Sequence, residues 1–151
     1  MYSLVIPVYK NEESLPDLLD VLAGMNSSLG GNLEVVIVVD GSPDNCYEIL
    51  RARLPKMPFR SQLLLHSRNY GSFAAIRVGM QVANGDFFAV MAADLQEPPE
   101  LALEFFRLLE ADEADVAVGT RDARNDPLRS RWSSEIFWWV YRKFIIKDIP
   151  A

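Results

Sequence analysis

A chain of 151 residues, half of them hydrophobic and 24% charged, has the size and composition of one globular domain, which excludes a mainly disordered chain. The formal net charge is −6, and residues 1–120 hold 8 Lys+Arg against 17 Asp+Glu, which argues against a general nucleic-acid-binding protein. The single cysteine, Cys46, cannot form an internal disulfide, and no stretch approaches the roughly 20 apolar residues of a membrane span.

Two pairs of a strand and a helix are predicted at the start of the chain. Residues 2–8 form a short apolar run that predicts a strand rather than a signal peptide. Asn11, followed by two glutamates, predicts the start of a helix, and residues 33–39 are typical of a strand buried on both faces. A turn at 40–44 and a helix over 45–54 complete the second pair. The first helix is expected to bury four leucines, Leu15, Leu18, Leu19 and Leu22.

The rest of the chain up to residue 120 continues the alternation. Residues 62–66 predict a third strand, and 72–83 predict a helix. An apolar run that begins at Gly85 predicts the fourth strand, a helix is expected from Pro99, and residues 115–119 predict a fifth strand. The two helices are expected to bury apolar stripes, formed by Phe73, Ile76, Met80 and Ala83 in one and by Leu101, Phe105, Leu108 and Leu109 in the other.

This alternation predicts an α/β fold with a mostly parallel sheet, right-handed crossovers and helices on both faces. Ligands bind such sheets at the carboxyl ends of the strands. A segment with polar residues stands at the end of each of the five predicted strands. These segments are Pro7 to Glu12, Asp40 to Asp44, Arg68–Asn69, Asp94 to Gln96 and Thr120–Arg121. We therefore expect the strand ends to converge on one crevice, beside which His66, the only histidine, is interpreted as structural.

The chemistry of these segments indicates a nucleotide-sugar donor. Asp94 and Gln96 offer oxygen ligands of the kind that Mg²⁺ or Mn²⁺ prefers. By themselves they also fit a polar loop that caps the next helix, but the other strand ends favour a binding site. The first strand and helix are joined without any glycine, which excludes a dinucleotide fingerprint and a P-loop there. Tyr9 can lie against a base, and Asp40 can accept a hydrogen bond from the ring N–H of uracil or guanine.

Five segments carry a resemblance to a known family: IPVYKNEE, VVDGSPDN, SRNYGSFAAIRVGM, GDFFAVMAADLQEPPE and VAVGTRDARNDP. Their order and spacing resemble the inverting family 2 glycosyltransferases of the GT-A fold. The DLQxPPE form resembles the branch of dolichyl-phosphate mannose synthases and bacterial undecaprenyl-phosphate glycosyltransferases. The resemblance covers essentially the whole chain. It implies a Rossmann-like nucleotide-binding GT-A sandwich over 1–120 and the start of an acceptor region over 121–151, in a chain that is expected to be C-terminally truncated.

The resemblance also implies roles for individual residues. The nucleotide sugar would be bound by Pro7, Tyr9, Glu12, Asp40, Arg68 and Asp94. Asp94 and Gln96 would hold Mg²⁺ or Mn²⁺ on the diphosphate, and Asp94 and Arg121 would be catalytic. The lipid phosphate acceptor is expected at Arg121, Arg129 and Arg131. The family usually has acids where Val39 and Ala92 stand, and the change at Ala92 predicts weaker donor binding or an altered metal dependence.

The implied reaction transfers a sugar from a UDP- or GDP-linked donor to a polyprenyl phosphate, undecaprenyl or dolichyl, with inversion. A lipid phosphate is largely ionised at neutral pH, so this acceptor requires no protein base. One alternative is a glycosyltransferase that uses a saccharide hydroxyl in cell-wall or polysaccharide synthesis, which needs a carboxylate base. A second alternative is a noncatalytic nucleotide-binding or assembly module, which Ala92 favours.

Residues 131–147 combine six aromatic side chains with four basic ones, a composition that suits a membrane interface. A core helix or an oligomer contact fits the segment about equally well. Together with the resemblance, the segment predicts that the full-length protein acts in the cytoplasm at the inner face of the cell membrane. An exposed aromatic surface there would also favour a homo-oligomer.

Overall fold

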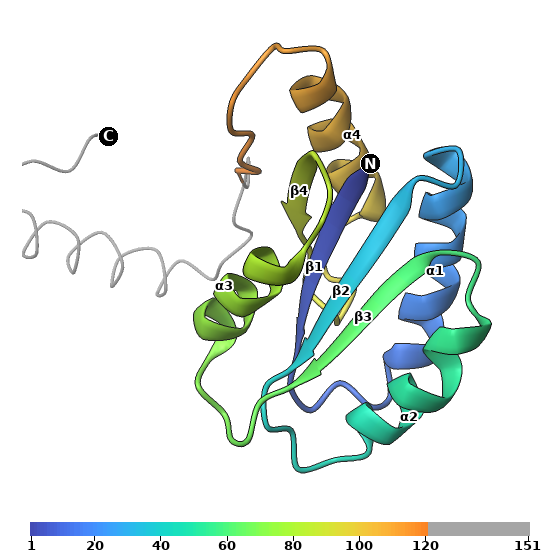
Figure 1. The fold of residues 1–151 in the computed structure, drawn as a ribbon, viewed down its shortest axis with the longest axis vertical. Coiled ribbons are helices and arrows are strands. Elements are labelled where there is room, and N and C mark those ends of the chain that lie inside the picture. The colour runs from blue at the N-terminus through green and yellow to red at the C-terminus, as the bar shows by residue number, and fades with distance from the viewer. Residues whose placement is uncertain (121–151) are drawn as a thin grey trace, which may run out of the picture. The chain divides into compact units, whose positions relative to one another are not determined.

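The computed structural model describes residues 1–120, in which strands and helices alternate along the chain (Figure 1). Met1–Val118 form one compact unit. Among the described residues, no helix is long and apolar enough to cross a bilayer. The strands are β1 (Tyr2–Val8), β2 (Leu33–Val39), β3 (Arg60–Leu65) and β4 (Phe87–Val90). The helices are α1 (Leu15–Ser28), α2 (Cys46–Arg53), α3 (Ser72–Val82) and α4 (Pro99–Glu110), with a short 3-10 helix, η1 (Leu54–Lys56), after α2.

The strand pairs of the described residues are all parallel, and the strand order is β3-β2-β1-β4. β1 lies between its two neighbours with Tyr2 beside Leu33 of β2 and beside Phe87 of β4. The chain therefore builds the sheet outward from β1 to β3 and then returns to the opposite side of β1. This reversal between β1 and β4 is the switch point at which open α/β sheets bind ligands, and it confirms the predicted fold class.

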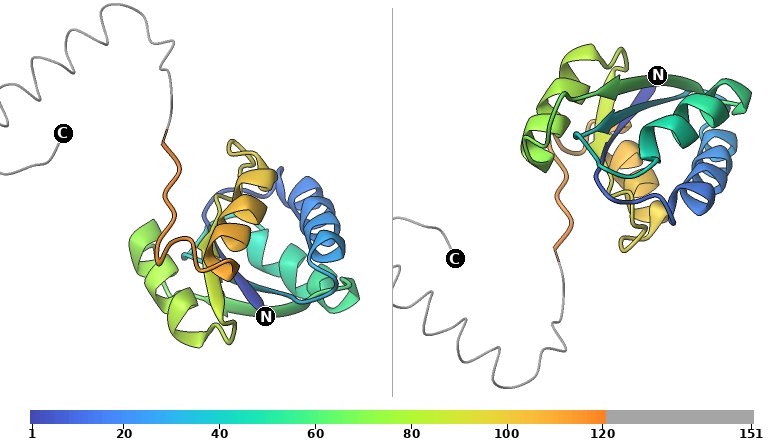
Figure 2. Two further views of the ribbon diagram at one scale, coloured as in Figure 1. Left: turned by 90° about the horizontal axis from the view of Figure 1, so that it is seen from above. Right: turned by 90° about the horizontal axis from the view of Figure 1, so that it is seen from below.

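One face of the sheet carries the larger core, formed with α1, α2 and α4. The four predicted leucines of α1 are all buried, because they recur at the spacing that places side chains on one side of a helix. All seven residues of β2 are buried, as expected for a strand covered on both faces. In both views of Figure 2, α3 lies apart from α1, α2 and α4, on the other side of the strands.

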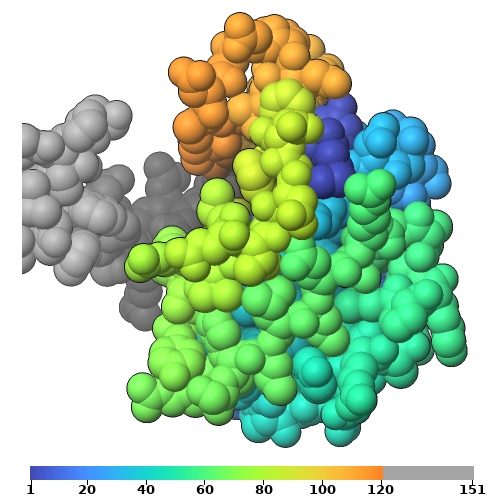
Figure 3. Space-filling model, viewed as in Figure 1, coloured from blue at the N-terminus to red at the C-terminus, as the bar shows by residue number. Residues whose placement is uncertain are grey.

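The other face is covered by α3, and the residues that we predicted for its buried stripe are partly wrong. Phe73 is 87% exposed and Met80 is 46% exposed, whereas Ala75 and Gly79 are the buried residues of this helix. Small side chains let α3 lie close to Val5, Val36 and Val38 of the sheet, which leaves no room for large ones at the contact. In Figure 3, this helix and the segment after it lie in front of much of β1.

Two further expectations need correction. Residues 115–119 do not form a strand; Val116 and Val118 are 77% and 76% exposed, and within the described part of the chain no strand pairs with them. Alternating apolar residues make a strand only where a partner accepts their backbone hydrogen bonds. In α4, the buried residues are Ala102 and Phe106, while the predicted stripe (Leu101, Phe105, Leu108 and Leu109) is only partly buried.

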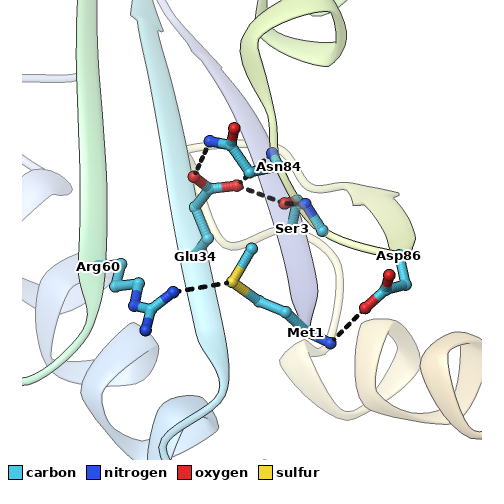
Figure 4. Close-up of polar contacts among 7 residues, drawn as sticks. Met1, Ser3, Glu34, Arg60, Asn84 and Asp86 are labelled. Carbon is cyan, nitrogen blue, oxygen red and sulfur yellow. Dashed lines mark hydrogen bonds and ion pairs between the residues drawn. The ribbon is translucent and has the colours of Figure 1, made fainter.

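A buried carboxylate at the amino end of β2 joins several elements (Figure 4). Glu34 accepts hydrogen bonds from the Ser3 hydroxyl (2.5 Å), from the Asn84 backbone N–H (2.8 Å) and side-chain amide (2.8 Å), and from the Gln62 amide (3.0 Å). Burial by itself raises the pKa of Glu34, but these hydrogen bonds outweigh it and lower the pKa to about 2. The charged group thus ties β1, β2 and β3 to the connection between α3 and β4.

Replacing Gly79 by alanine tests the close contact between α3 and the sheet. The added Cβ would overlap Cγ1 of Val5, so we expect Gly79→Ala to lower the free energy of unfolding by about 1–3 kcal/mol. Gly24→Ala is the matched control, because Gly24 lies in α1 with no atom near its Cβ position. It should raise stability by about 0.5–1 kcal/mol. Urea unfolding measures both, and equal effects would contradict the close contact.

The acid dependence of stability tests the Glu34 cluster. Because the pKa of Glu34 is lower in the folded protein, its ionised form adds stability above pH 4.5, and this stability is lost as the pH falls toward 2. At neutral pH, Glu34→Gln should therefore cost on the order of 3 kcal/mol, and the difference from the wild type should close in acid. Glu48→Gln is the control, because the Glu48 carboxylate lies 3.9 Å from the Arg51 guanidinium in an exposed ion pair. It should change the free energy of unfolding by less than about 0.5 kcal/mol. Urea unfolding at a series of pH values measures both differences.

Candidate nucleotide-binding site

A cavity of about 310 Å³ opens at the carboxyl ends of the strands, at the switch point between β1 and β4. Its walls come from segments that follow all four strands of the described sheet. In Figure 1 the carboxyl ends of β1, β2 and β3 point downward, and the loops that follow them meet there. The cavity is lined by Pro7, Val8, Tyr9, Asn11, Asp40, Asn69, Gly71, Ser72, Ala92, Ala93 and Asp94.

Asp40 is the buried anion of this site. Its carboxylate accepts hydrogen bonds from the backbone N–H groups of Tyr70 (2.9 Å) and Gly71 (2.7 Å), and it lies 2.7 Å from Nδ1 of His66. Burial by itself raises the pKa of Asp40, but the hydrogen bonds from Tyr70, His66 and Gly71 outweigh it and lower the pKa. Asp40 is therefore ionised at neutral pH and holds the loop after β3 against the end of β2.

The turn after Asp40 lies directly against that same loop. Gly41 has a φ of +59°, and a Cβ at this position would overlap the backbone of Arg68 and Asn69. Only glycine tolerates both the left-handed backbone and this contact. Gly41, which belongs to the turn predicted at 40–44, therefore also allows the loops after β2 and β3 to approach each other closely.

The loops after β1 and β2 are joined by a second set of hydrogen bonds. The Lys10 N–H donates to Oγ of Ser42 (2.7 Å), and the Glu12 N–H donates to the carboxylate of Asp44 (3.3 Å). The Glu12 carboxylate in turn accepts from the backbone N–H (3.0 Å) and the side-chain amide (3.1 Å) of Asn45. Asp44 also accepts from the N–H of Cys46 at the start of α2. These contacts fix the loop that carries Tyr9.

The structure brings four of the predicted nucleotide-binding residues to the cavity and leaves two outside its lining. Pro7, Tyr9, Asp40 and Asp94 line it. Glu12 is engaged with Asn45 as described, and the guanidinium of Arg68 lies 4.9 Å from the ring centre of Tyr70. Neither belongs to the lining. The predicted acceptor residues Arg121, Arg129 and Arg131, and the segment 131–147, lie outside the described residues.

Sequence reasoning did not single out the wall formed by Gly71 and Ser72. Both residues line the cavity, and the turn SRNYGS directly after the third strand was the signal that could have indicated them. His66 was interpreted as structural. Its ring contacts the buried carboxylate of Asp40 and supports that group.

Asp94 lies on the cavity wall, in the middle of the loop that joins β4 to α4. Its Oδ1 accepts from the N–H of Gln96 (3.2 Å), and the Ser14 hydroxyl holds the loop by donating to the carbonyl of Ala93 (2.9 Å). Within residues 1–120, no three or more His, Cys, Asp or Glu side chains are grouped as metal ligands. One carboxylate, with an oxygen that accepts no hydrogen bond from the described residues, still fits Mg²⁺, which one or two carboxylates, substrate phosphates and water commonly hold. Gln96 is exposed and does not line the cavity.

Comparison with known proteins agrees with this architecture. The chain is 41% identical over 138 residues to an undecaprenyl-phosphate 4-deoxy-4-formamido-L-arabinose transferase of Pseudomonas paraeruginosa, covering 90% of this chain and 40% of that protein. The transferase of the same name from Edwardsiella ictaluri is 40% identical over 136 residues, with 89% and 41% covered. The chain thus spans about two fifths of the length of these relatives.

Solved structures share the fold at lower sequence identity. Residues 1–349 of TarS from S. aureus match with a TM-score of 0.62 and 21% identity, covering 83% of this chain and 38% of that one. The complex of the same protein with UDP-GlcNAc matches with a TM-score of 0.60. The family profile described as Glycosyl transferase family 2 matches residues 3–150, and the chain therefore belongs to glycosyl transferase family 2.

Proposed function

We propose that the protein transfers a sugar from a nucleotide-diphosphate sugar to a polyprenyl phosphate, with inversion at the anomeric carbon. The observation that carries this proposal is the cavity at the switch point, which has the ionised Asp40 on one wall and Asp94 on another. Relatives about 40% identical are named undecaprenyl-phosphate transferases, which supports a polyprenyl phosphate as the acceptor. In this assignment Asp40 accepts from a ring N–H of uracil or guanine, and Tyr9 and Pro7 flank the base.

Asp94 is assigned to the diphosphate, where its carboxylate would hold Mg²⁺ or Mn²⁺ together with the phosphate oxygens. When bound, the cation would offset the negative charge that develops on the leaving diphosphate. An oxygen of the ionised acceptor phosphate forms the new bond to the anomeric carbon as the bond to the diphosphate breaks, and the nucleoside diphosphate leaves with the electron pair. No proton has to be removed from the acceptor, so this step needs no protein base.

The acceptor side of the proposal rests on residues outside the described part of the chain. We assign Arg121, Arg129 and Arg131 to the lipid phosphate, Arg121 as a catalytic residue, and the segment 131–147 to the membrane surface. The reaction would then take place at the cytoplasmic face of the cell membrane, with 1–120 as the nucleotide-sugar-binding core and 121–151 as the start of the acceptor region.

A noncatalytic nucleotide-binding module is the second candidate, and Ala92 is the observation that favours it. Ala92 lines the cavity two residues before Asp94. The family usually has an acid at this position, and alanine provides no charge to the cavity there. Binding of the donor without transfer would be the result that this candidate predicts.

Replacing Asp94 tests the proposed function. Using the product of the whole gene in membranes, transfer of radiolabelled sugar from UDP- and GDP-sugars into organic-extractable lipid should fall at least about a hundredfold in Asp94→Asn. Asp112→Asn, at an exposed position after α4, is the control and should retain the wild-type rate. Label in polysaccharide would identify a saccharide hydroxyl as acceptor, and nucleotide binding without any transfer would identify the noncatalytic module.

Restoring an acid at Ala92 tests how the donor is held. Ala92→Asp adds a second carboxylate, besides that of Asp94, to the segment after β4 that lines the cavity. Because charged ligands tune cation affinity, it should strengthen Mn²⁺-dependent binding of UDP or GDP by about tenfold. Ala92→Asn has nearly the same shape without the charge, and it should bind as the wild type does. Isothermal titration with and without Mn²⁺ measures the effect, and equal affinities of all three proteins would refute it.

A further inference from the structure

His66 lies directly after β3 and is held from two sides. Its backbone N–H donates to the carbonyl of Val39 at the end of β2 (2.9 Å). Its ring packs edge-on against Tyr70, with 5.4 Å between the ring centres and an angle of 89°. The side chain is 14% exposed, so both its position and its ring plane are constrained by neighbours. Nδ1 of this fixed ring lies 2.7 Å from Oδ1 of Asp40.

The hydrogen bonds of Asp40 use its two oxygens unequally. Among residues 1–120, Oδ1 receives the His66 ring N–H and the Tyr70 N–H, whereas Oδ2 receives only the Gly71 N–H. A carboxylate oxygen accepts about two hydrogen bonds in the plane of the group. Oδ1 is therefore fully used, and one acceptor position remains on Oδ2. Because Asp40 lines the cavity while its side chain is only 3% exposed, this position is available to a cavity ligand rather than to bulk water.

We infer that His66 is a positioning residue for base recognition, one that acts through Asp40 and does not itself touch the ligand. By taking the second acceptor position of Oδ1, it leaves Oδ2 as the oxygen that can accept from a donor in the cavity. A base with a ring N–H, such as uracil or guanine, supplies that donor, whereas cytosine and adenine present an unprotonated ring nitrogen there. This role deepens the proposed function, because it rests on a nucleotide being the ligand of the cavity.

A structural role for His66 alone makes a different prediction. If the ring served only to fill space beside Tyr70, its replacement would lower stability without changing which base is preferred. If the ring positions Asp40, the preference itself must change, because without the ring Oδ1 also has a free acceptor position and Oδ2 is no longer the one oxygen that can accept from the cavity. The ratio of affinities for two bases therefore separates the two roles, while stability alone does not.

The experiment compares two replacements of His66 with a control on β3, the strand that precedes it. His66→Asn keeps an N–H donor near the place of Nδ1, whereas His66→Leu keeps the bulk and removes the donor. Ser61→Ala is the control, because Ser61 is exposed near the opposite end of β3. Isothermal titration with Mn²⁺ gives the affinities for UDP and CDP, and for GDP and ADP, while urea unfolding records the stability of each variant.

We expect His66→Leu to weaken binding of UDP or GDP by about tenfold. The preference of the protein for UDP over CDP, or for GDP over ADP, should fall by a similar factor. His66→Asn should restore both quantities to within about threefold of the wild type, since it restores the hydrogen bond. An unchanged preference in a folded His66→Leu variant would overturn the role of His66 while leaving the proposed function standing. Failure of the wild-type protein to bind any of the four nucleotides would overturn both.

If His66→Leu does not fold, a measurement on the wild-type protein tests the positioning role of His66. In NMR spectra, saturating UDP or GDP should shift the ring signals of His66 and the amide signals of Tyr70 and Gly71, because all three share the Asp40 carboxylate with the base. CDP at the same concentration should leave them nearly unchanged. Binding of UDP or GDP without any shift of these three groups would overturn the inference.

Discussion

The buried carboxylate of Asp40 is the interaction on which the candidate site depends. A charge removed from water is tolerated only when hydrogen bonds replace its hydration, and here two backbone N–H groups and one imidazole provide them. Those donors all belong to the segment that follows β3. Satisfying the charge therefore also folds that segment, and the wall that contains Asn69, Gly71 and Ser72 follows from a single electrostatic requirement.

β2 carries a comparable requirement at each of its ends. Glu34 near the amino end and Asp40 just beyond the carboxyl end are both buried anions, and each accepts hydrogen bonds from segments that are distant in the sequence. Between them, the five consecutive buried residues 35–39 supply the apolar contacts. One end thus holds the sheet together at its base, and the other end organises the cavity. Glu34 thus contributes to stability at one end of the strand, and Asp40 contributes to the candidate binding site at the other.

The sequence predicted those features that depend on local patterns. β1 and β2 occur where their apolar runs stand, and α1 buries the four leucines whose spacing places them on one side. The polar ends of the strands indicated the cavity, because parallel strands present their carboxyl ends at one edge. What pattern alone could not supply was the distance between elements. The burial of Ala75 and Gly79 in place of Phe73 and Met80 depends on how closely α3 approaches the sheet, and the missing fifth strand depends on pairing. The contact between His66 and Asp40 joins residues 26 positions apart, which no motif encodes.

The unequal covering of the two faces has a consequence for motion. α3 rests on a small cluster of four buried residues, whereas α1, α2 and α4 share a core several times larger. Elements with few buried contacts open at lower free energy than the rest of a domain, so the amides of α3 should exchange with solvent before those of α1. Because α3 begins at Ser72 on the cavity wall, the helix that packs on the smaller cluster also forms part of the candidate site. A bound nucleotide that closes this wall would slow hydrogen exchange along α3, far beyond the residues that it touches.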